Sequence, residues 1–196
     1  MFKFSSKRIA LIAVFIALCV AINSFEINLS NELKISFTIT VCTLAGLFTG
    51  FIGGALTGFL GDLIGCMLTG LTPIPLLSVS NALLGLIPGL AFDLYRKFFG
   101  NITAIKGVII ILVCQLILFS TVTLFINTYA IWDFYGIGAK STKSYMVWTI
   151  ARVFPVQMLN SLMNLAVSCV LFVSIIRVSF FKKYLNFDKT ENKVEE

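Results

Sequence analysis

Long apolar stretches, separated by short polar or basic segments, run through most of the chain. Between residues 35 and 71 there is a single charged residue, Asp62. The same stretch holds eight glycines, four of them at every fourth position: Gly46, Gly50, Gly54 and Gly58. A bilayer core about 30 Å thick needs roughly 20 helical residues, so this stretch is too long for one crossing. It predicts two transmembrane helices joined by a tight turn near Gly50.

The same pattern predicts six spans, at about residues 9–24, 35–50, 52–70, 75–95, 103–128 and 145–176. Charged residues make up 12% of the chain, against about 25% in soluble domains. We therefore expect an all-α, multi-pass protein of the plasma membrane. Residues 1–178 are expected to form one compact six-helix bundle, and residues 179–196 a partly disordered cytoplasmic tail.

Basic residues are distributed unevenly between alternate connections. With the N-terminus inside, Lys34, Lys140 and Lys143 fall outside, and Arg152 lies in or near the membrane. The cytoplasmic side then receives Lys3, Lys7, Arg8, Arg96, Lys97, Lys106, Arg177, Lys182, Lys183, Lys189 and Lys193. This bias predicts that both termini are cytoplasmic. It also accounts for the net charge of +6 without a nucleic-acid partner.

The chain contains no histidine, which removes the usual general base and the commonest metal ligand. The five cysteines are far apart and lie in apolar spans, where thiols behave as small hydrophobes. No GxxxxGK[ST] phosphate loop is present. We therefore expect no enzyme activity, catalytic residue, cofactor or metal, and any uphill transport needs energy from a partner or an ion gradient.

Two charged residues fall within predicted spans, where charge is costly and indicates function by default. Asp62 is interpreted either as a structural lock held by hydrogen-bond donors, or as a proton relay or ligand contact. Arg152 is interpreted either as reaching the outer headgroups or pairing with Asp62, or as an anchor for a ligand carboxylate.

Amide side chains in the spans are expected either to link helices or to line a ligand cavity, and their number favours a cavity. They are Asn81, Gln115, Gln157, Asn160 and Asn164. In the connection from Tyr129 to Tyr145, aromatic residues form either an interfacial belt or a flexible lid. In the lid hypothesis, Trp132 or Tyr135 closes over a flat ligand while Lys140 and Lys143 attract an anion.

Alanines three and four residues apart share one face of the first span: Ala10, Ala13, Ala17 and Ala21. Small residues of this kind allow close helix packing in lipid. The face predicts either packing within the chain or docking of another membrane subunit.

Several segments together carry a resemblance to a known family. They are Lys34-Ile35-Ser36-Phe37, the run from Leu44 to Gly50, Gly53-Gly54-Ala55 through Gly61-Asp62-Leu63, and Gly85-Leu86-Ile87-Pro88-Gly89. With the six short spans and the alanine face, they resemble the substrate-binding S components of energy-coupling factor (ECF) vitamin transporters over residues 7–178. Within that family they look most like the folate branch.

The resemblance implies a six-helix bundle that captures a water-soluble vitamin, with a folate-like ligand favoured. It also implies docking, through the alanine face, on a transmembrane T component coupled to two cytoplasmic ATPase subunits. The expected ligand contacts are Arg152, Asn81, Gln157, Asn160, Trp132, Tyr135 and Asp62. A different vitamin or precursor, or an autonomous small carrier or channel, are the alternatives.

Overall fold

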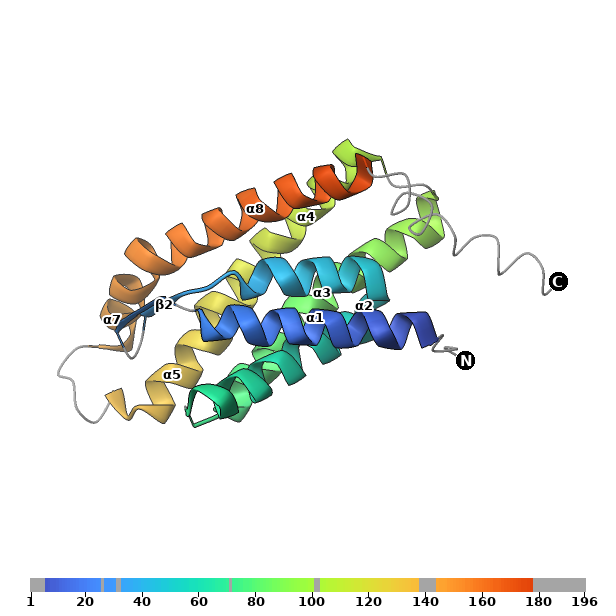
Figure 1. The fold of residues 1–196 in the computed structure, drawn as a ribbon. Helices are drawn as coiled ribbons and strands as arrows, with labels where there is room; N and C mark the ends of the chain where they lie inside the picture. The colour runs from blue at the N-terminus through green and yellow to red at the C-terminus, as the bar shows by residue number, and fades with distance from the viewer. Residues whose placement is uncertain are drawn as a thin grey trace.

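The computed structural model describes residues 6–25, 27–30, 33–70, 72–100, 103–137 and 144–177. The predicted tail, residues 179–196, lies outside them. Helices lie side by side in a bundle, with a short hairpin at one end (Figure 1). In chain order, with η marking a π-helix, the elements are α1 (Ser6–Ser24), β1 (Ile27–Ser30), β2 (Leu33–Ile35), α2 (Thr38–Thr69), α3 (Pro75–Phe99), α4 (Ala104–Leu118), η1 (Phe119–Asn127), α5 (Thr128–Phe134), α7 (Tyr145–Arg152), η2 (Val153–Gln157) and α8 (Met158–Arg177).

Among the residues that the structure describes, the predicted set of six helices is confirmed. These are α1, the two halves of α2, α3, the continuous rod α4–η1–α5 and the continuous rod α7–η2–α8. Four segments are long and apolar enough to cross a membrane, namely Thr38–Thr69, Pro75–Phe99, Ala104–Phe134 and Met158–Arg177, while α1 is apolar but shorter. Within the described residues the hairpin β1–β2 is the departure from an all-α chain, and the sequence did not predict it.

The tight turn predicted near Gly50 is confirmed, because α2 breaks and reverses there. Gly50 has φ 77° and ψ 179°, a backbone conformation that favours glycine. Two side chains of α3 hold this elbow. Asp93 accepts a hydrogen bond from the backbone N–H of Phe51 (3.2 Å), and Arg96 donates to the carbonyl of Leu47 (2.8 Å). The negative Asp93 therefore lies at the N-terminus of the second half of α2, which carries a positive partial charge. The positive Arg96 lies at the C-terminus of the first half, which carries a negative partial charge.

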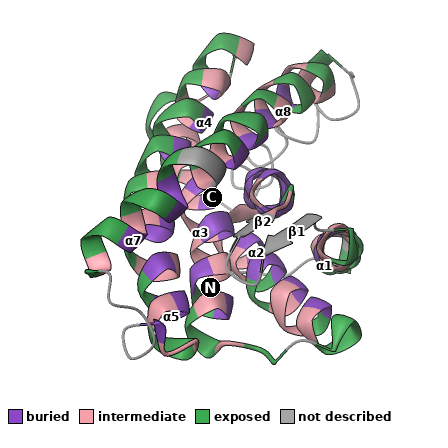
Figure 2. Cartoon of the chain, turned by 90° about the vertical axis from the view of Figure 1, so that its left-hand side faces the viewer, coloured by how far each residue is buried: buried purple, intermediate pink, exposed green. Residues whose placement is uncertain are grey.

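The first half of α2 forms the centre of the bundle. Nearly all of its residues from Thr38 to Thr49 are buried, and buried positions face the interior in Figure 2. Twelve helical residues extend about 18 Å, which is short for a bilayer crossing. This length is tolerated because the rest of the chain surrounds the segment.

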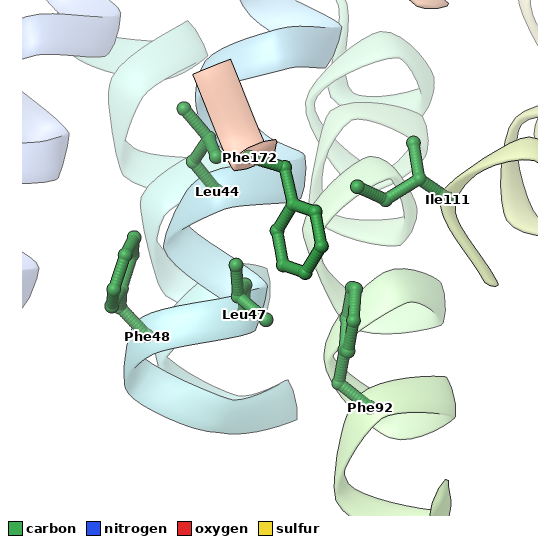
Figure 3. Packing of buried hydrophobic residues seen from close by; sticks show 6 residues of the cluster. All are labelled: Leu44, Leu47, Phe48, Phe92, Ile111 and Phe172. Atoms are coloured by element: carbon green, nitrogen blue, oxygen red, sulfur yellow. The ribbon is translucent and has the colours of Figure 1, made fainter. Parts of the chain in front are cut away.

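Two apolar clusters fill the interior along the bundle. The elbow cluster, shown in Figure 3, consists of Leu44, Leu47, Phe48, Phe92, Ile111 and Phe172. Its rings of Phe92 and Phe172 have centroids 5.9 Å apart. The central cluster consists of Cys19, Val41, Cys42, Leu84, Leu118 and Val122. Together they bring α1, α2, α3, the α4–η1 rod and α8 to one core.

The bundle has two distinct ends in Figure 1. One, here called the elbow end, holds the Gly50 turn, the start of α1 and the end of α8. The other, the hairpin end, holds β1–β2, α5 and α7. This arrangement matters for function because the two ends carry different chemistry.

Candidate functional site

Arg152 is placed at the hairpin end, at the C-terminus of α7, with 6% of its surface exposed. Its Nη1 donates to Oγ1 of Thr128 on α5 at 2.8 Å, and its guanidinium lies 5.8 Å from the ring centre of Trp148. Thr128 is itself fixed, because its hydroxyl donates to the carbonyl of Thr123 at 2.8 Å. The geometry therefore holds a buried cation in one orientation between two helical rods.

Aromatic side chains gather next to this arginine. Trp132 of α5 lies 5.2 Å, between ring centres, from both Tyr145 and Trp148 of α7. We call this group the tryptophan cluster; its buried members are Ile131, Ile137 and Trp148, and Leu77, Trp132 and Tyr135 pack against them. Trp132 belongs to helix α5 rather than to a loop, so the lid hypothesis applies at most to the residues after it. Lys140 and Lys143 lie outside the described residues.

Asp62 connects the second half of α2 to α3. Its Oδ2 accepts from the hydroxyl of Ser78 at 2.6 Å, and its Oδ1 accepts from the amide of Asn81 at 2.8 Å. These are the contacts that the structural interpretation of Asp62 requires. Among the described residues Asp62 makes no pair with Arg152, and the amide of Asn81 is directed at Asp62.

Asn160 and Asn164 fasten α8 to the segment that leads from the hairpin into α2. The Oδ1 atom of Asn160 accepts from the backbone N–H of Ser36 (3.2 Å), while Nδ2 of Asn164 donates to the carbonyl of Ser36 (2.8 Å). Oδ1 of Asn164 accepts from both the N–H (3.2 Å) and the hydroxyl (2.9 Å) of Thr40. Gln157, the third amide of this series, lies partly buried in η2.

The hairpin β1–β2 completes this end of the bundle and was missed from the sequence. Its strands pair antiparallel, with Ile27 opposite Ile35 and Asn28 opposite Lys34. β2 lies against η2, the segment that follows Arg152. The backbone contacts of Asn160 and Asn164 therefore also fix where the hairpin joins the helices.

The alanine face of α1 points away from the other described helices. Ala10, Ala13, Ala17 and Ala21 are all exposed. The opposite face of α1 packs on α2: Cys19 is fully buried, in contact distance of where a side chain at Gly61 would lie, and Asn23 donates to the carbonyl of Gly61 at 3.2 Å. The face is therefore open to lipid or to another membrane protein.

The sequence matches the family described as "ECF transporter, substrate-specific component" over residues 7–176. Six chains of known structure match. One of them, "Crystal structure of FolT bound with folic acid", has a TM-score of 0.59 and 20% identity, covering 86% of this chain and 91% of that one. At this identity the likeness concerns the fold alone. No curated protein matches the sequence. Since the family match spans most of the sequence, the chain belongs to the substrate-specific components of ECF transporters, which are transporter subunits and not enzymes.

Proposed function

We propose that this chain captures a water-soluble vitamin from outside the cell and delivers it through an ATP-driven ECF transporter of the plasma membrane. A folate-like vitamin is the favoured ligand. The observation that carries the proposal is the buried Arg152 beside the tryptophan cluster, within a chain of the S-component family. Such a cation attracts an anionic group, and the indole rings offer flat surfaces to a heterocycle.

The distribution of charge supports an outward-facing site. The elbow end carries basic residues at helix ends: Arg8 near the start of α1, Arg96 and Lys97 at the end of α3, Lys106 at the start of α4 and Arg177 at the end of α8. Basic residues favour the cytoplasmic side. The elbow end and both termini are therefore assigned to the cytoplasm, and Arg152 to the outer side.

The ligand contacts are assigned from this geometry. Arg152 binds a carboxylate, and Trp132 and Tyr135 pack against the ring system, with Gln157 nearby on η2. Asp62, Asn81 and Asn160, also expected at the ligand, are assigned to shaping the site, because each is already hydrogen-bonded to another element or connecting segment. Folic acid has both a fused ring and carboxylates, and a solved protein of similar fold is described as binding it.

The exposed alanine face of α1 is assigned to docking on the transmembrane T component, which is coupled to two ATPase subunits. Four small side chains on one helix face let a second helix approach closely. In this proposal the chain binds the vitamin by itself but moves it only as part of the full assembly.

The test uses purified chain, first alone and then reconstituted with the other subunits. Arg152→Ala should weaken folic acid binding by about 2–5 kcal/mol if the ion pair is desolvated. Arg152→Lys should keep only part of that binding energy, because lysine lacks the planar guanidinium that pairs with a carboxylate through two N–H groups. Arg177→Ala, an exposed arginine at the elbow end, is the matched control. Unchanged affinity in Arg152→Ala contradicts the site, and ATP-independent uptake by the chain alone contradicts the transporter role.

A further inference from the structure

Thr128 and Arg152, which meet between the two helical rods, each lie where a rod changes its helical register. Thr128 is the first residue after the π-helix η1, and Arg152 is the last residue before the π-helix η2. A π-helix closes its hydrogen bonds over one residue more than an α-helix, so it changes which side chains face a neighbouring helix. Both rods therefore depart from regular α-helix at the place where they make this contact.

The hydroxyl of Thr128 follows the π register. It donates to the carbonyl of Thr123, five residues earlier, at 2.8 Å. The hydroxyls of Ser120 and Thr121 in the same rod donate instead to carbonyls four residues earlier. A hydroxyl has one hydrogen, and a guanidinium has donors alone. Because the hydrogen of Thr128 is used on Thr123, its oxygen is left as an acceptor for Nη1 of Arg152.

This arrangement gives a buried cation a neutral partner. Arg152 exposes 6% of its surface and Thr128 exposes 0%, and a charge at such depth is costly unless hydrogen bonds satisfy it. A carboxylate in the place of Thr128 would also supply an acceptor, but it would cancel the positive charge. A hydroxyl orients the guanidinium without cancelling its charge. The nearby ring of Trp148 is likewise neutral and favours a cation.

We propose that Thr128 is a positioning residue, which acts through Arg152 and directs its guanidinium towards the carboxylate of the bound vitamin. This inference rests on the proposed function and adds to it the residue that orients the central cation. Orientation matters because a guanidinium pairs with a carboxylate through two parallel hydrogen bonds, which a rotated guanidinium cannot form. Thr128 therefore governs the affinity for ligands that carry a carboxylate, and it does not read the ring.

The same hydrogen bond also ties α5 to α7, and a purely structural tie leads to different expectations. Loss of a tie would alter the shape of the whole hairpin end, and would weaken ligands with and without a carboxylate alike. A charged acceptor in place of Thr128 would keep the tie, and would keep the affinity if the tie were its whole role. Positioning by a neutral acceptor predicts the opposite in both cases.

The experiment uses two probes, folic acid and 6-methylpterin, which has the same fused ring but no carboxylate. Affinities of detergent-purified protein are measured by calorimetry and, for weak binding, from the rise of Tm with ligand concentration. Thr128→Val keeps the shape of the side chain and removes the acceptor. We expect it to weaken folic acid binding about tenfold or more and to leave 6-methylpterin binding unchanged. Thr128→Ser keeps the hydroxyl and should restore most of the affinity.

Two further variants complete the experiment. Thr57→Val is the matched control, because Thr57 also exposes 0% of its surface and its hydroxyl also donates to a backbone carbonyl at 2.8 Å. It should leave both affinities unchanged. Thr128→Asp keeps an acceptor at nearly the same size but adds a negative charge, and it should weaken folic acid binding more than Thr128→Val does. This variant tests the inference even if Thr128→Val does not fold.

The outcomes separate this inference from the proposed function. If Arg152→Ala loses folic acid binding while Thr128→Val keeps the wild-type affinity, the inference is wrong and the proposed function stands. If Thr128→Val weakens both probes equally, or Thr128→Asp binds folic acid as the wild type does, Thr128 is a structural tie and its positioning role is overturned. If the wild-type chain binds neither folic acid nor any other vitamin in a panel, both are wrong.

Discussion

Gly54 lies where the two halves of α2 meet α3, and it provides a direct test of this packing. A Cβ atom at Gly54 would lie 2.5 Å from the carbonyl oxygen of Gly85, 2.9 Å from its carbonyl carbon and 2.7 Å from Cα of Gly46. All three are backbone atoms, so no side-chain rotation relieves the overlap. Because real Cβ contacts under 3.0 Å are essentially never seen, Gly54→Ala must separate α2 from α3 by about 0.5 Å or more.

The expected cost follows from two opposing effects. Overpacking a close contact costs about 1–3 kcal/mol, and a backbone contact belongs to the upper part of that range. In a free helix, by contrast, the exchange of glycine for alanine would gain up to about 1 kcal/mol. The net loss is about 2 kcal/mol, which for a chain of this size lowers Tm by about 4–8 °C.

Thermal unfolding of the purified protein in detergent measures this loss. Gly65→Ala is the matched control in the same helix, because the atoms nearest to its Cβ would be side-chain atoms of Asn23, Nδ2 at 2.8 Å and Cβ at 3.0 Å, and not the backbone of another helix. It should lower Tm by less than half as much. A Gly54→Ala protein as stable as the wild type, or more stable, would show that the helices are not in backbone contact there.

Further predictions concern two other contacts and the docking surface. Asp93→Ala removes the acceptor at the elbow and should cost about 1 kcal/mol, as loss of a helix cap does; an unchanged Tm would contradict the elbow contacts. Asn164→Leu removes the partner of two backbone groups, the buried N–H of Thr40 and the partly buried carbonyl of Ser36, and should cost about 3 kcal/mol or more in a denaturant titration, whereas a loss under about 0.5 kcal/mol would refute this role. Ala17→Trp should leave folic acid affinity unchanged and abolish co-purification with the T component, while Leu116→Trp, at a position exposed by 59% on α4, should not. Equal co-purification of both variants would contradict the docking surface.

Much of the helical architecture could be predicted because it depends on local pattern. The length of the apolar stretch and the glycine at its middle required a break, and Gly50 supplies the positive φ that the turn needs. The continuity of α7, η2 and α8 through Pro155 agrees with the single span predicted at about residues 145–176. The hairpin β1–β2 could not be predicted in this way, because strands of four and three residues show too little alternation of apolar and polar residues to be distinguished from a loop.

The roles of the polar side chains were harder to predict because their partners are distant in sequence. Asn160 stays a predicted ligand contact, and its Oδ1 accepts a hydrogen bond from the backbone N–H of Ser36, 124 residues earlier. Asn81 likewise stays a predicted ligand contact, and its amide donates to Asp62. From sequence an amide that lines a cavity and one that links two helices look the same, since both face inward. Only the packing decides between them.

Retention of a small molecule by the purified chain is the most direct test of the account. Native mass spectrometry of the protein, expressed without its partner subunits and purified in mild detergent, would reveal a vitamin carried through purification. The account predicts a stoichiometric adduct with the mass of a pterin-containing vitamin, lost in Arg152→Ala and retained in Arg177→Ala. No adduct, together with no thermal stabilisation by any member of a vitamin panel, would contradict capture by this chain.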